Sequence, residues 1–122
     1  MTDQRPPESG SERRAAPRAV YLSPARLLHG DTSIDGRIQN LSYSGLLIAL
    51  PASPVSMGDV VVVRFSLPIS GNVVSLAATA VRLVPGKTGG VDVGVHFEEP
   101  PEDAQMEIAR FVLALAPPAS AD

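Results

Sequence analysis

The feature that most constrains the fold is the strict alternation in the segment "GVDVGVHFE", residues 90–98. Apolar side chains occupy every second position of this segment, at Val91, Val93, Val95 and Phe97. Because successive side chains of a strand point to opposite faces, the pattern predicts a strand with one side facing a core. His96 falls between two apolar positions and is therefore predicted to be exposed on the opposite face.

Five further extended segments precede this strand and are separated by turn residues. We predict them at residues 21–28, 37–40, 46–50, 59–67 and 72–84. The fourth shows the same alternation, with Val61, Val63, Phe65 and Leu67 on one face. Six short strands favour a small antiparallel barrel, because closure removes the unpaired edges of a sheet. The predicted fold class is thus mainly β, a six-stranded antiparallel β-barrel.

The segment "PPEDAQMEIARFVLALAPP", residues 100–118, has a different pattern. It begins with proline and acidic residues, which suit the N-terminus of a helix. Apolar residues follow at helical spacing, namely Ala104, Ile108, Phe111, Val112 and Leu115. We predict a C-terminal α-helix that ends before Pro117 and packs this stripe on the barrel. Insertion of the stripe into a groove of a partner protein is the less favoured interpretation.

The chain divides into three parts by composition. Residues 1–18 are rich in Pro, Glu, Ser and Arg and are predicted to form a flexible N-terminal arm. Residues 19–116 hold the barrel and the helix, and residues 117–122 are predicted to be a disordered tail. The 122-residue length and the 44% hydrophobic content are typical of one folded domain.

Several classes of function are disfavoured by what the chain lacks. The net charge of -3 and the 4% aromatic content without Trp oppose nucleic-acid binding. The absence of cysteine and the wide separation of the two histidines argue against metal sites and cofactors. No catalytic triad order or phosphate-binding glycine loop is present, so we do not expect an enzyme. No signal peptide or membrane span is visible, which predicts a cytoplasmic protein without membrane insertion.

Two short motifs carry the candidate chemistry. The first is "RRAAPR" in the arm, with Arg13, Arg14 and Arg18. The second is "NLSYSG", with Asn40, Ser42 and Gly45. Side chains two apart on an extended segment face the same way, so the amide and the hydroxyl can address one ligand. The glycine permits either a positive φ or a close approach of another backbone.

Each motif also has a simpler interpretation. The arginines could form a basic tail that only improves solubility. Asn40 and Ser42 could satisfy the backbone of their own turn, which is compatible with binding as well. The residues at the variable positions, Tyr43 and Ser44, are predicted to be exposed turn residues rather than specific contacts.

In this order and spacing, the two motifs resemble the signature of the PilZ domain family, which binds the bacterial second messenger cyclic di-GMP. The likeness continues through "GDVVVVRFSLP", "AVRLV" and "VGVHF" into the closing helix, and covers nearly all of residues 12–115. It implies a six-stranded antiparallel barrel with a C-terminal helix. It also implies a nucleotide held between the barrel surface and the N-terminal arm.

The resemblance assigns roles to particular residues. Arg14 and Arg18 would contact guanine edges and phosphates, Asn40 and Ser42 would bond a guanine, and Gly45 would shape the turn. Arginine suits these roles because its planar fork matches guanine and phosphate, and its flat face stacks on a purine. Arg13 is less determined: it would touch phosphate, join a second stacked ligand or be solvated.

The function expected from the resemblance is that of a receptor. Cyclic di-GMP would order the arginine arm over the nucleotide, and the protein would pass the signal to an unidentified effector protein as a monomer or weak dimer. The alternative is a PilZ-like adaptor that contacts proteins without binding nucleotide. An enzyme and a nucleic-acid-binding barrel are less favoured than either.

Overall fold

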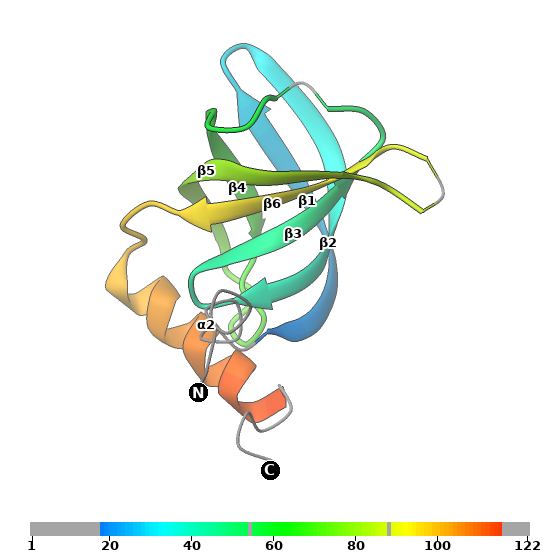
Figure 1. The fold of residues 1–122 in the computed structure, drawn as a ribbon. Coiled ribbons are helices and arrows are strands. Elements are labelled where there is room, and N and C mark those ends of the chain that lie inside the picture. The colour runs from blue at the N-terminus through cyan, green and yellow to red at the C-terminus, as the bar shows by residue number, and fades with distance from the viewer. Residues whose placement is uncertain (1–17, 54, 88, 116–122) are drawn as a thin grey trace, which may run out of the picture.

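The structure is a computed structural model that describes residues 18–53, 55–87 and 89–115. It contains six strands and one helix: β1 (Ala19–His29), β2 (Thr32–Ser42), β3 (Gly45–Leu50), β4 (Val60–Ser66), β5 (Val73–Pro85), β6 (Val91–Phe97) and α2 (Glu102–Leu115). All strand pairs are antiparallel, and the strands close into a barrel in the order β1-β2-β3-β6-β5-β4. The predicted fold class is confirmed (Figure 1).

The interior of the barrel is filled by aliphatic side chains from every strand. Fully buried examples are Leu27, Ile38, Ile48, Val63, Leu76 and Val93. Helix α2 lies under one end of the barrel (Figure 1) and contributes Ala104, Ile108 and Val112 to the same core. The alternating residues of β4 and β6 face this core as predicted, although Val91 is only half-buried, and His96 is exposed.

Two residues of the predicted helical stripe behave differently from the other three. Phe111 is half-buried and packs edge-on against Tyr21 of β1, with ring centroids 5.3 Å apart. Leu115 was expected in the stripe, but it is 61% exposed. It is the last residue of α2, and Figure 1 shows this last turn directed away from the strands. The prediction for Leu115 is therefore wrong, because the last turn of the helix extends beyond the surface on which the helix packs.

Strand β2 is much longer than the predicted segment 37–40. Its first half, "TSIDG", lacks an apolar alternation and was not recognised. Pairing with β1 overrides this weak local preference, from His29↔Thr32 to Pro24↔Arg37. The two strands are joined by a two-residue turn in which Gly30 adopts a φ of 60°, as hairpin turns require.

The outer parts of the predicted organisation lie beyond the described ranges. Residues 1–17 of the predicted arm and the predicted tail 117–122 are both outside them. Within the residues that are described, no helix is long and apolar enough to cross a membrane.

Candidate functional site

The two sequence motifs meet on the outer surface of the barrel. The first residues of β1 pair with the end of β2, through Ala19↔Leu41 and Val20↔Asn40. This pairing places Arg18, just before β1, beside Asn40. A terminal nitrogen of Arg18, Nη1, donates a hydrogen bond to Asn40 Oδ1 at 2.8 Å. Residues 22 positions apart in the chain thus form one contact at the predicted site.

The strands on both sides of this contact are irregular. The register between β1 and β2 shifts between Val20 and Ser23, and the register between β2 and β3 shifts between Ile38 and Asn40. Such bulges bend a strand and re-aim its side chains, and they are common beside functional sites. Asn40 therefore lies where two ladders are locally distorted.

Asn40 belongs to a row of paired residues that crosses four strands. Asn40 of β2 pairs with Leu47 of β3, which pairs with Gly94 of β6, which pairs with Arg82 of β5. We call these four residues the arginine–amide row. A Cβ at Gly94 would lie only 3.2 Å from Arg82 Cβ, so the glycine leaves room above the sheet. A pocket of about 150 Å³ opens along the row and is also lined by Arg18, Leu46, Val81 and Val95.

Among the described residues, no carboxylate neutralises the positive charge at this pocket. Partial burial and, next, the nearby charge of Arg82 lower the pKa of the Arg18 guanidinium below its ordinary value. Arginine nevertheless stays charged at neutral pH. The hydrogen-bond partner of Arg18 is a neutral amide, and in the described ranges neither Arg18 nor Arg82 pairs with a carboxylate. Two guanidinium groups beside an open pocket favour an anionic ligand.

A second hollow adjoins the first and widens the available surface. It has a volume of about 490 Å³ and shares Asn40 and Leu47 with the first pocket. Val20 and Leu22 of β1 line it and are 73% and 62% exposed. The volume falls within the range of about 300–1,000 Å³ that is typical of ligand sites, whereas the first pocket alone is smaller. Asn40 thus stands between an arginine-lined pocket and a hollow of mixed lining, which includes Lys87 and Asp92 besides Val20 and Leu22.

Ser42 lies beneath this surface. Its side chain is fully buried, and its hydroxyl oxygen accepts hydrogen bonds from the N–H groups of Ser44 and Gly45 at 3.3 and 3.1 Å. Its Oγ also lies 3.2 Å from the Gly45 carbonyl, to which it donates. The self-satisfied turn that we considered for this motif is therefore present at Ser42. A direct contact between Ser42 and a ligand stays a prediction.

Gly45 is required by close packing and not by a positive φ. A Cβ on Gly45 would lie 2.0 Å from the carbonyl oxygen of Val95 on β6, far inside contact distance. Of the two reasons that we considered for this glycine, the structure shows the close approach of another backbone. The glycine allows β3 to pair with β6 directly after the turn.

The variable residues of the second motif are less exposed than expected. Tyr43 and Ser44 are both half-buried, and Tyr43 packs against the hydrophobic core. The Ser44 carbonyl accepts a hydrogen bond from the Phe97 N–H at 2.8 Å, which ties the turn to the end of β6. The expectation of exposed turn residues is therefore wrong, because the turn packs against the core and the end of β6.

Two of the predicted site residues lie outside the described ranges, and one residue of the pocket was not predicted. Arg13 and Arg14 lie outside the described residues, so their positions stay predictions. Arg82 was missed by sequence reasoning, although an arginine in the apolar run "AVRLV" was a weak signal. Its direction depends on a register shift in β5 between Ala80 and Arg82, which the sequence does not reveal.

The comparisons with known proteins concern the family and the fold. The family model described as "PilZ domain" matches residues 12–114. This chain belongs to the PilZ domain family. The findings support a family of cyclic di-GMP receptors. No curated protein matches the chain.

Solved PilZ structures share its fold at low sequence identity. The PilZ domain of YcgR from Escherichia coli, solved with c-di-GMP, is 17% identical with a TM-score of 0.64, covering 84% of this chain and 91% of that one. The Bacillus subtilis inhibitor of motility MotI/DgrA is 15% identical with a TM-score of 0.73, covering 84% of this chain. Our chain spans only 50% of MotI/DgrA. The PlzA protein of Borreliella burgdorferi, in complex with c-di-GMP, is 18% identical with a TM-score of 0.55, covering 90% of this chain and 41% of that one.

Proposed function

We propose that this PilZ protein binds cyclic di-GMP on the outer surface of its barrel and passes the signal to a partner protein. The observation that carries the proposal is the hydrogen bond between Arg18 and Asn40, which joins the two family motifs at one place. The pocket beside it holds uncompensated positive charge. Two related structures that share the fold were solved with this nucleotide.

Each residue of the site has a role that its environment supports. Arg18 and Arg82 would receive the phosphates or stack on a guanine, since a guanidinium can do both. Asn40 would exchange its bond to Arg18 for bonds to a guanine edge, because the amide offers donors and an acceptor. Ser42 and Gly45 would hold the turn that places Asn40. Arg14 and Arg13 would reach the nucleotide from the arm.

The proposed signal is the ordering of the arm. Fixing the backbone of one residue costs about 1–2 kcal/mol, so ordering five arm residues costs about 5–10 kcal/mol. A micromolar affinity leaves only about 8 kcal/mol of net binding free energy. The gross contact energy must therefore exceed the net binding free energy by the cost of ordering the arm. In return, binding becomes a local rearrangement that a partner can recognise.

Isothermal titration calorimetry of the full chain with cyclic di-GMP tests the proposal. We expect saturable heat with the wild type, and its stoichiometry will distinguish one ligand from a stacked pair. Cyclic di-AMP is the matched ligand control, because it keeps the phosphates and changes the base edge. No heat at high micromolar cyclic di-GMP would contradict the proposal and favour the adaptor that binds proteins alone.

Backbone NMR tests the proposed signal separately. Residues 11–18 should lose mobility when the nucleotide is added, while β3 and β6 stay as rigid as before. If these residues show the same relaxation with and without nucleotide, arm ordering is not the signal, even if the nucleotide binds.

A further inference from the structure

A second row of charged residues crosses the barrel away from the nucleotide site. Asp35 of β2 pairs with Arg26 of β1, Arg26 pairs with Arg64 of β4, and Arg64 pairs with Ser75 of β5. We call these four residues the seam row. In the closed strand order, the β1–β4 junction lies across the barrel from the β3–β6 junction. The seam row is therefore centred on a different face from the arginine–amide row.

The charges of the seam row do not balance. Arg26 Nε donates to Asp35 Oδ1 at 2.8 Å, and this ion pair is largely exposed. Arg64 is exposed as well, and in the described parts of the chain it has neither a hydrogen bond nor an ion pair. Like charges directly opposite each other across two strands are unfavourable. No interaction among the described residues therefore explains why an arginine stands at position 64.

Strands β1 and β4, which carry Arg26 and Arg64, stop pairing one residue beyond these arginines. Pairing between β1 and β4 runs only from Leu28↔Val62 to Ala25↔Phe65. The next residue of β1, Pro24, has no N–H to continue a ladder. Beyond it, the hydroxyl of Tyr21 donates to the Ser66 carbonyl at 2.6 Å and bridges the two strands again. A wedge-shaped opening therefore lies between the last ladder pair and the tyrosine bridge.

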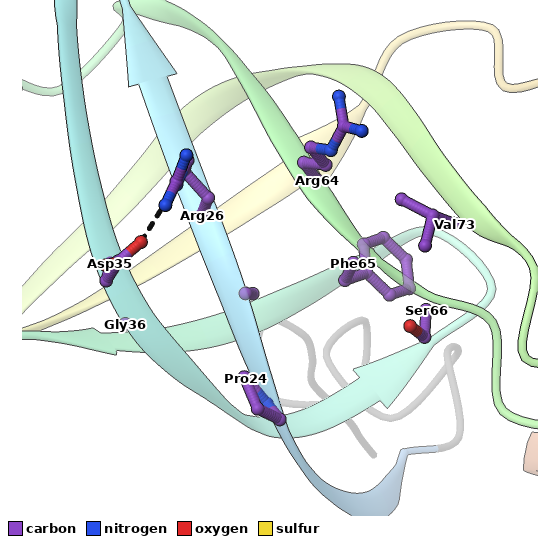
Figure 2. A pocket seen from close by; sticks show the side chains of 9 residues that line it. Pro24, Arg26, Asp35, Gly36, Arg64, Phe65, Ser66 and Val73 are labelled. Atoms are coloured by element: carbon purple, nitrogen blue, oxygen red, sulfur yellow. Dashed lines mark hydrogen bonds and ion pairs between the residues drawn. The ribbon is translucent and has the colours of Figure 1, made fainter.

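A hollow of about 550 Å³ occupies this region. Figure 2 shows Arg26 and Arg64 on neighbouring strands toward one end of the hollow, with Pro24 and Ser66 toward the other. Val73 lines the side next to Ser66 and is 57% exposed. The hollow thus combines two guanidinium groups with apolar surface and a serine hydroxyl, and within the described ranges one of the guanidinium groups and the hydroxyl have no partner.

We propose that the hollow between β1 and β4 is a docking surface for an acidic peptide segment of a partner protein. A carboxylate of the segment would bind Arg64 and the free nitrogens of Arg26, since a carboxylate matches the guanidinium fork. A neighbouring apolar side chain would pack on Val73 and Pro24. A nucleic acid is disfavoured, because Arg26 already pairs with Asp35 and one remaining guanidinium is too little local charge to hold a phosphate backbone.

The docking surface gives the receptor proposed above a place to contact its effector, and in that role it rests on the proposed function. Docking itself requires no nucleotide. The test is therefore made without cyclic di-GMP, so that its failure leaves the calorimetric test of nucleotide binding unaffected.

The experiment is an NMR titration of the full chain at low ionic strength with acetyl-Glu-Leu-Glu-amide. The matched control peptide is acetyl-Gln-Leu-Gln-amide. We expect saturable shifts in the Nε–H signals of Arg26 and Arg64 and in the backbone amides of Ser66 and Val73. The control peptide and inorganic phosphate should bind at least about tenfold more weakly, because each lacks one half of the recognition.

Variants separate docking from a structural role. Arg64→Gln should weaken the acidic peptide about tenfold while leaving the melting temperature unchanged or slightly raised, because it relieves the repulsion from Arg26. Arg110→Gln removes the same charge from exposed α2 and should leave the peptide affinity unchanged. The proposal is overturned by no saturable shift at millimolar peptide, by equal binding of the glutamine peptide, or by equal loss in both variants. Equal binding of inorganic phosphate would indicate a small-anion site and would likewise overturn it.

Discussion

The pocket along the arginine–amide row and the seam row both place guanidinium groups on the outside of one barrel, but their partners in the protein differ. Arg18 is held by a neutral amide and faces the charge of Arg82, with no carboxylate partner in the described ranges. Arg26 is matched by Asp35, which leaves only Arg64 without a partner. The first region therefore offers two uncompensated charges and the second offers one.

This difference teaches what each region can select. Cyclic di-GMP carries two phosphates and two guanines, so in the proposed function it would suit a site with two guanidinium groups and an amide. A single carboxylate needs less charge and gains from the apolar side of the hollow between β1 and β4. The free energy of a contact to an arginine depends on whether that arginine already has a charged partner. An exposed ion pair is worth about 0–1 kcal/mol, whereas a hydrogen bond to a charged group is worth about 1.5–3 kcal/mol.

The largest expected effect concerns nucleotide affinity. Arg18→Ala should weaken cyclic di-GMP binding about 100-fold or more, because it removes a charged contact and the residue that joins the two motifs. Arg64→Ala should leave nucleotide affinity unchanged. Calorimetry measures both, and the melting temperature of the free protein should change little, since the Arg18 bond to Asn40 is exposed. Equal affinities for the two variants would erase the distinction between the rows.

The next effect concerns stability beneath the two regions. Ser42→Ala should lower the free energy of unfolding by about 1–3 kcal/mol, because it leaves the buried N–H of Gly45 without its acceptor. Ser66→Ala is the matched control, since the hydroxyl of Ser66 makes no hydrogen bond within the described residues. Urea unfolding measures both. A harmless Ser42→Ala would show that water can replace the hydroxyl.

A smaller effect is expected from the residue that sequence reasoning missed. Arg82→Ala should weaken cyclic di-GMP about tenfold, because Arg82 lines the pocket but belongs to neither motif. The free protein should be as stable as the wild type, because removing Arg82 relieves its repulsion of Arg18. An unchanged nucleotide affinity would remove Arg82 from the site and leave the two motifs as the whole of it.

The smallest effect lies near the β4–β5 turn, beside the second region. Glu107 of α2 accepts hydrogen bonds from the N–H groups of Ile69 and Ser70. Partial burial alone would raise the pKa of Glu107, but these bonds and the charge of Arg110 lower it below its ordinary value. A lowered pKa stabilises the fold at pH values above the unfolded-state pKa, and this contribution is lost as the pH falls through the folded-state pKa.

Glu107→Gln should therefore reduce stability slightly at pH 7 and make the acid side of the stability profile shallower. Urea midpoints between pH 7 and 3 measure this, with Glu102→Gln as a control on an exposed helical carboxylate. A loss of stability that is the same at every pH would mean that shape, and not charge, joins α2 to the turn.

The fold could be predicted from the sequence wherever apolar residues alternate along a strand and so mark the face that is buried. The alternation in β4 and β6 predicted their core residues, because a strand that is buried on one face has apolar residues at every second position. The first half of β2 left no such trace, since its pairing with β1 determines it. Leu115 and Tyr43 were misjudged for a related reason, because the extent of a packing surface is a tertiary property.

The site was predictable only as far as its motifs extend. Arg18 and Asn40 were expected together and are in contact. The direction of Arg82, the burial of the Ser42 hydroxyl and the close approach at Gly45 all depend on strand register. Register across a closed barrel is set by all the pairs at once, so a single segment does not encode it.

Closure of the barrel restricts how binding of a ligand on one face can change the structure of other parts of the protein. A strand with neighbours on both sides cannot slide without disrupting both ladders, so the cylinder acts as a stiff frame. Tyr21 stands at the irregular point of β1, three residues after Arg18, and touches both β4 and α2. A displacement of β1 near Arg18 would therefore reach both β4 and α2 through the hydrogen bond and the ring contact of this one side chain.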